Sequence, residues 1–142
     1  MTALDALQAT LSAEHAALHL YGLYGGRTSQ SADPALFEAL QDGYRVHRAR
    51  RDQLRLMVSD LGAEPVAAGA AYDEPAGLRG PARVAREALG TEQACAETYA
   101  ALVAQTSGRD RRWGATALTE AAVLQLRLGG RPEDFPGAPE LG

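Results

Sequence analysis

Residues 4–25 read LDALQATLSAEHAALHLYGLYG, and this stretch decides the fold because it combines a helical apolar pattern with one misplaced charge. Its apolar residues are Leu4, Leu7, Leu11, Leu18 and Tyr21. They lie three or four residues apart, as on the buried face of a packed helix, except for one gap of seven between Leu11 and Leu18. The gap in this series is filled by Glu14. A carboxylate on a buried face is costly unless a cation, a proton or a metal ion neutralises it. The functional question posed by the sequence is therefore what Glu14 faces.

The composition of the chain excludes several classes of protein. A length of 142 residues fits one domain with a sizeable core, and a net charge of −4 argues against nucleic-acid binding. The first residues, MTALDALQ, lack the apolar run of a signal peptide, and no segment reaches the roughly 18 apolar residues of a membrane span. Cys95 is the single cysteine, so no intrachain disulfide is expected. We therefore expect a cytoplasmic protein with no nucleic-acid and no membrane partner.

Proline and glycine positions divide the chain into four helical segments. The apolar pattern predicts helices at about residues 3–25, 34–61, 81–107 and 109–128, followed by a tail at 129–142. Pro34 and Pro81 stand at helix starts, where the missing N–H of proline costs nothing, and Asp33 is a good cap.

The segment between the second and third helices, residues 62–80, shows no helical pattern. Such a length is unusual for a loop, but it suits a link between two parallel helices. The chain must then travel back along about 40 Å of helix, at roughly 1.5 Å per helical residue, which an extended segment of this length can do. The sequence therefore predicts a single all-α domain, a four-helix bundle with one long crossover.

Polar side chains interrupt the predicted buried faces near the middle of each helix. They are Glu14, Tyr44, His47, Arg51, Glu92 and Glu120. Because all six lie near mid-helix, we expect them to fall in one layer of the bundle.

This layer resembles the metal site of the dinuclear carboxylate proteins of the ferritin-like superfamily. Those proteins carry a Glu on the first helix and a Glu-x-x-His on the second, and the third and fourth helices repeat the pattern. In this chain Tyr44 stands in place of the Glu on the second helix, and Val123 stands in place of the His on the fourth. The resemblance implies a ferritin-like four-helix bundle and a metal site, for iron or manganese, with the ligands Glu14, His47, Glu92 and Glu120.

The chain also resembles, over nearly its whole length, a family of small bacterial ferritin-like domain proteins of unknown function. The stretches that carry this likeness are AEHAALHLYG, HRARRDQL with LGAEP, EQACAETYAALV, ALTEAAVLQLR and FPGAPE. The likeness implies a fold and supplies no substrate.

Two interpretations of the polar layer remain open. In the first, which we favour, Arg51 lies one turn beyond His47, and the two cations neutralise Glu14 and Glu92 without a metal ion, while Tyr44 donates its hydroxyl to the same structural network. In the second, the site has kept one or two weakly held iron or manganese ions.

Three functions follow from these interpretations. The first is a non-catalytic protein that self-associates as a homodimer through alanine-rich helix faces, at Ala16-Ala17, Ala100-Ala101 and Ala121-Ala122. The second is a metal-binding protein that handles metal or oxygen species. The third is a bundle that binds a small molecule in a pocket lined by Tyr44, Cys95 and Tyr99. No catalytic residue is assigned, because no arrangement of nucleophile and base emerges from the sequence.

Overall fold

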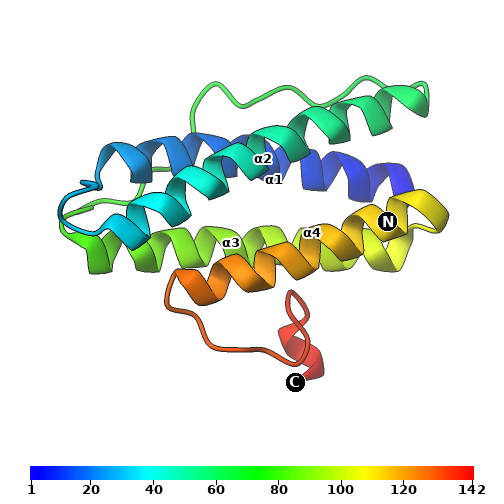
Figure 1. The fold of residues 1–142 in the computed structure, drawn as a ribbon. Helices are drawn as coiled ribbons and strands as arrows, with labels where there is room; N and C mark the ends of the chain where they lie inside the picture. Colours follow the sequence, from blue (N-terminus) through cyan, green and yellow to red (C-terminus); the bar gives the residue numbers. More distant parts are fainter.

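The structure, a computed structural model, describes residues 1–142 and contains four long helices and no strand (Figure 1). The helices are α1 (Ala3–Gly26), α2 (Pro34–Asp60), α3 (Pro81–Gln105) and α4 (Gly108–Arg127), followed by the short 3-10 helix η1 (Pro139–Leu141). This confirms the predicted all-α class, and every helix end lies within two residues of the expected one. None of the helices has the length and hydrophobicity that a membrane span needs.

Local sequence signals explain where the helices begin. At the start of α1, the Thr2 N–H donates to Asp5 Oδ2 at 2.8 Å and the Asp5 N–H donates to Thr2 Oγ1 at 3.1 Å, which is a capping box. At the start of α2, the carboxylate of Asp33 accepts from the Leu36 N–H at 3.0 Å, and Pro34 occupies the first turn. These contacts satisfy N–H groups that have no partner inside the helix.

The helices form two antiparallel hairpins, α1 with α2 and α3 with α4. Figure 1 shows that α2 and α3 run in the same direction, so the chain between them returns along the outside of the bundle. α1 packs closely against both α2 and α3, and α3 packs closely against α4, whereas α2 and α4 touch only slightly. The bundle is thus closed on three sides and looser along the α2–α4 side.

The crossover, residues 61–80, is fastened to the outer face of α1. The side-chain amide of Gln8 donates to the carbonyl of Glu64 at 2.7 Å and accepts from the N–H of Val66 at 2.8 Å. His15 Nε2 donates to the carbonyl of Val66 at 3.0 Å. Polar side chains of α1 therefore supply partners to a segment that has no secondary structure of its own.

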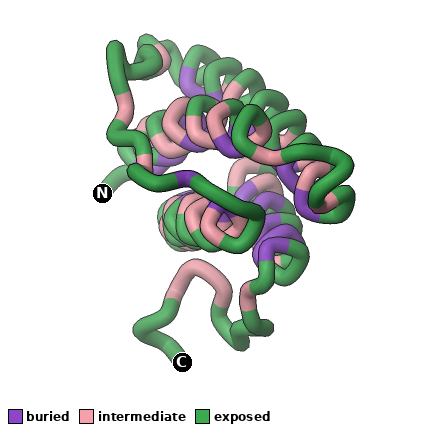
Figure 2. The backbone as a smooth tube through the Cα atoms, turned by 90° about the vertical axis from the view of Figure 1, so that its left-hand side faces the viewer, coloured by how far each residue is buried: buried purple, intermediate pink, exposed green.

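Buried residues recur along all four helices, on the sides that face the other helices (Figure 2). Larger apolar residues gather toward the two ends of the bundle, such as Tyr24, Leu40 and Val84 at one end and Leu11, Leu54 and Leu102 at the other. The cluster between them consists mostly of small residues: Ala17, Cys95, Ala96, Tyr99, Ala117 and Ala121. Two alanines expected at a subunit contact, Ala17 and Ala121, thus belong to the core of the chain itself. The small side chains leave room for polar groups at mid-height.

Candidate functional site

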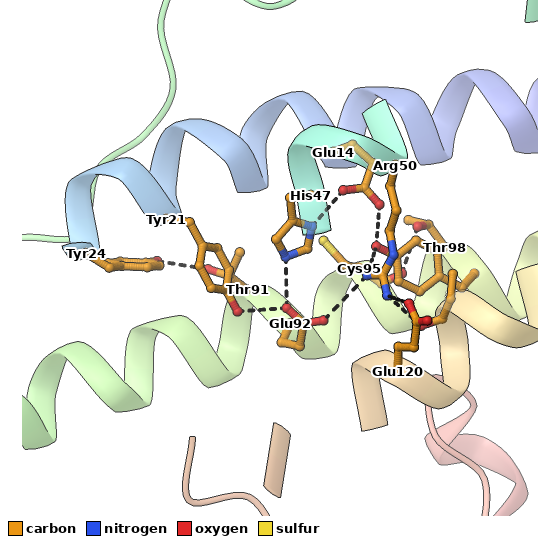
Figure 3. Close-up of polar contacts among 12 residues, drawn as sticks. Glu14, Tyr21, Tyr24, His47, Arg50, Thr91, Glu92, Cys95, Thr98 and Glu120 are labelled. Carbon is orange, nitrogen blue, oxygen red and sulfur yellow. Dashed lines mark hydrogen bonds and ion pairs between the residues drawn. The ribbon is translucent and has the colours of Figure 1, made fainter. Parts of the chain in front are cut away.

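The candidate site is centred on His47, which lies between two glutamates from other helices (Figure 3). Glu14 comes from α1, His47 from α2 and Glu92 from α3, and all three side chains are fully buried. His47 Nδ1 is 2.7 Å from Glu14 Oε2, and His47 Nε2 is 2.9 Å from Glu92 Oε2. The imidazole ring therefore joins three helices at one level of the bundle, as the sequence predicted for these three residues.

This geometry favours a protonated His47. Each ring nitrogen faces a glutamate oxygen, and because an ionised carboxylate can only accept, the imidazolium is the form that donates to both glutamates. Burial by itself lowers the pKa of His47, but the hydrogen bonds and negative charges of Glu14 and Glu92 outweigh burial and raise the pKa to about 9. The site thus contains an imidazolium at neutral pH.

A second buried cation, Arg50, lies one turn further along α2. Its Nη1 donates to the hydroxyl of Tyr99 at 3.0 Å, and that hydroxyl in turn donates to Glu14 Oε1. Its Nη2 donates to the carbonyl of Ala117 at 3.3 Å and to Glu120 Oε2 at 2.9 Å. The guanidinium therefore links α2 to α3 and α4, and through Tyr99 to α1.

Two buried tyrosines complete the network as hydrogen-bond donors. Tyr21 donates its hydroxyl to Glu92 Oε2 at 2.8 Å, and Tyr99 donates to Glu14. Burial and the neighbouring carboxylates raise the pKa of both hydroxyls well above 10.0, so both stay protonated.

The charges of the buried groups balance without any further ion. Glu14 and Glu92 supply two negative charges, and His47 and Arg50 supply two positive charges. Arg50 Nη1 lies 4.0 Å from Glu92 Oε1, the one oxygen of the two buried carboxylates that accepts no hydrogen bond. A balanced set of this kind can remain in the core, because each buried charge has a counter-charge nearby.

Two residues expected in the network do not take part. Tyr44 is 38% exposed and forms no hydrogen bond. Arg51 is half-buried and turned away from the network, and its Nε donates to exposed Asp52 Oδ1 at 2.9 Å. The reason is helical phase, since each residue advances about 100° around the helix. Positions 44 and 51 lie about 40–60° to one side of His47, whereas Gly43 and Arg50 lie equally far to the other side. The bundle buries the second side.

The residues that sequence reasoning missed are Arg50 and the network role of Tyr21 and Tyr99. Two series of positions three and four apart pass through Leu40 and His47, one through Tyr44 and one through Gly43. Glycine carries no apolar side chain to mark its series as the buried one. The pattern alone therefore could not choose Arg50 over Arg51.

The expected pocket lined by Tyr44, Cys95 and Tyr99 does not form. Cys95 and Tyr99 are packed inside the core, and Tyr44 lies at the surface. Burial raises the pKa of the Cys95 thiol well above 9.0, so the thiol stays neutral and acts as a packing group.

The predicted metal ligands are not all drawn together. Glu14, His47 and Glu92 meet in the core, but the Glu120 side chain is 58% exposed and its carboxylate is held by Arg50. No group of three or more His, Cys, Asp or Glu side chains is arranged to hold a metal ion. Because both nitrogens of His47 are engaged and a guanidinium stands between Glu92 and Glu120, this donor set does not fit a dinuclear metal site. Metal binding by these residues stays a prediction.

Fold and site together define an all-helical protein whose four helices are joined at mid-height by a buried ionic network. Residues 6–140 match the family model described as a domain of unknown function, DUF4439, and the protein belongs to this family. The chain is also similar to a solved structure, that of a conserved hypothetical protein, rv2844, from Mycobacterium tuberculosis. The sequences are 32% identical, the TM-score is 0.80, and the match covers 89% of this chain and 95% of the other. None of the curated proteins matches the chain.

Proposed function

We propose that this protein is a non-catalytic member of the ferritin-like superfamily in which two protein cations occupy the place of the metal ions. Support for the ferritin-like assignment comes from the long crossover between the parallel helices α2 and α3. It also comes from glutamates at mid-height on α1 and α3, with a histidine on α2 between them.

The observation that carries the proposal is the double engagement of His47. A histidine that binds a metal ion offers an unprotonated nitrogen to it. Here both nitrogens must carry protons to donate to Glu14 and Glu92, so the ring supplies positive charge in place of an ion. Arg50 supplies the second positive charge. The network therefore holds the four helices together, and none of its side chains is left free to coordinate a metal ion.

Metal analysis tests this proposal against the alternative, an iron or manganese protein. The protein is incubated without oxygen with iron(II) or manganese(II), desalted and analysed for bound metal, beside Glu14→Gln and His19→Gln. We expect far less than one ion per chain in all three, because the cations already balance the carboxylates. About one or two ions per chain in the native protein, lost in Glu14→Gln, would overturn the proposal. Metal that is lost only in His19→Gln would be bound at the surface, and the core would be metal-free as proposed.

We also propose that the protein works by association with a second copy. A shallow groove of about 340 Å³ on the outer α1–α3 side is lined largely by small residues, among them Ala13, Ala16, Gly90 and Ala94. Such residues let a helix of another subunit approach closely. Sedimentation velocity at tens of micromolar should then give a dimer that Ala94→Arg disrupts and Ala115→Arg, on exposed α4 surface, does not. A monomer at every concentration would rule the dimer out.

A further inference from the structure

The loose α2–α4 side of the bundle contains a groove that reaches Arg50. Its larger part, of about 480 Å³, is lined by residues of both helices and includes Arg50, Arg112 and Trp113. A second part, of about 330 Å³, continues along the same side and shares Val46, Arg50 and Glu120 with the first. The groove thus extends over the one side of the bundle where the two flanking helices make little contact.

Arg50 forms the floor of this groove. Its side chain is only 5% exposed, yet its Nη2 bonds a carboxylate, that of Glu120, which is itself largely in solvent. The other partners of the guanidinium, the Tyr99 hydroxyl and the Ala117 carbonyl, belong to the packed interior. The Nη2 atom of Arg50 therefore faces the groove, and it already donates to the carboxylate of Glu120.

The walls of the groove favour an anion with an apolar body. Arg112 adds positive charge, whereas Arg109 is already paired with Asp60 and Asp110, and Glu120 is the single acidic residue of the larger part. Arg112 forms no ion pair, so its guanidinium is free to meet a ligand. Trp113 provides an aromatic surface, and its ring is held in place because Nε1 donates to Gln53 Oε1 at 2.8 Å.

We propose that this groove binds a small organic carboxylate, whose carboxylate group displaces Glu120 from Arg50 and whose apolar part lies against Trp113. Arg112 offers paired N–H donors that match the two oxygens of a carboxylate, and Arg50 adds the Nη2 donor that now holds Glu120. The volume of the groove lies within the range of small-molecule sites. Glu120 acts as an internal occupant that keeps Arg50 paired when no ligand is bound.

The test uses 4-phenylbutyrate as the probe and its uncharged amide, 4-phenylbutanamide, as the control. Trp113 is the only tryptophan of the chain, so its fluorescence reports on the groove, and titration calorimetry gives a second readout. We expect the carboxylate to bind about tenfold or more tightly than the amide, because it alone forms charged hydrogen bonds with the arginines.

Three variants separate ligand binding from a structural role. Glu120→Gln should tighten phenylbutyrate binding roughly fivefold, because the competing carboxylate is removed and the side-chain shape is kept. Arg112→Gln should weaken it roughly threefold, whereas Arg111→Gln, the neighbouring arginine outside the groove, should leave it unchanged. If the Arg50–Glu120 salt bridge had only a structural role, Glu120→Gln would lower the stability of the protein and would not raise its affinity for phenylbutyrate.

Several results would overturn the proposal. Equal affinity for acid and amide, or no binding of either up to millimolar concentration, would mean that the groove does not select a carboxylate. Unchanged affinity in Glu120→Gln would mean that Glu120 does not occupy the ligand position. A dimer that Arg112→Gln dissociates, with no binding of phenylbutyrate, would assign the groove to a carboxylate of a second copy. None of these results bears on the metal titration, which probes the core.

Discussion

At the scale of single residues, His47 and Arg50 decide the character of the site. Two carboxylates buried without cations would repel each other and lose their hydration, which is too costly for a small domain to tolerate. Each cation meets more than one negative or polar partner, so neither can be removed without leaving a buried charge unpaired. The network is therefore expected to be cooperative.

A matched pair of substitutions tests which arginine belongs to this network. Arg50→Leu should lower the free energy of unfolding by about 3–5 kcal/mol, since it strips the counter-charge from Glu92 and the donor from Tyr99. Arg51→Leu, the adjacent position, should change it by about 0.5 kcal/mol or less, because its partner Asp52 lies at the surface. Urea unfolding followed by circular dichroism measures both. Equal effects of the two substitutions would contradict the assignment of Arg50 to the core.

The sequence predicted part of this site for a physical reason. Glu14, His47 and Glu92 stand out because each interrupts a series of apolar residues, and all three are buried. Arg50 could not be found in this way, since its series contains a glycine. Which side of a helix is buried depends on the neighbouring helices, and that is not encoded in the local pattern.

At the scale of elements, α2 is positioned by one close approach. Gly43 lies against the ring of Tyr21, and a Cβ at this position would sit 2.2 Å from Tyr21 Cε1. The absence of a side chain thus lets α1 and α2 approach until Tyr21 reaches Glu92. A glycine inside a helix costs about 1 kcal/mol relative to alanine, and the packing of Tyr21 and its hydrogen bond to Glu92 offset that cost.

The ends of the helices were easier to predict than their faces. Asp33, Pro34 and Pro81 act on the backbone next to them, so their effect can be inferred without knowing the fold. The crossover was likewise predicted from its length and lack of periodicity. Its attachment through Gln8 and His15 was not, because both residues look like ordinary solvent-exposed positions of α1.

At the scale of the whole molecule, the network is the one feature that joins all four helices. Glu14 lies on α1, His47 and Arg50 on α2, Glu92 on α3 and Glu120 on α4, whereas α2 and α4 otherwise touch only slightly. Loss of charge on His47 should therefore weaken the fold as a whole.

Stability should fall as the pH rises through the neutral range. The pKa of His47 is raised from 6.5 to about 9 in the folded protein, so its contribution is complete below pH 6.5 and is lost as the pH approaches 9. At about 1.4 kcal/mol per pH unit, the loss amounts to about 2–3 kcal/mol between pH 6.5 and 8.5. The groups that face His47 are Glu14, Glu92 and the ring of Tyr21, and Arg50 lies next to Glu92. The raised pKa values of Tyr21 and Arg50 keep both groups protonated over this range.

Urea unfolding at a series of pH values from about 6 to 8.5 measures this loss. The chain has three histidines, so the variant with both His15→Gln and His19→Gln retains His47 alone and should show the same decline. The series stops at pH 8.5 to exclude an effect of Cys95. Burial raises the pKa of its thiol in the folded protein above 9.0, so this thiol would also lower stability with rising pH, but only near pH 9.0 and above. If the double variant were equally stable from pH 6.5 to 8.5, His47 would not be the imidazolium that its two carboxylate partners require. The proposal that protonated His47, together with Arg50, takes the place of metal ions at the centre of the bundle would then fail as well.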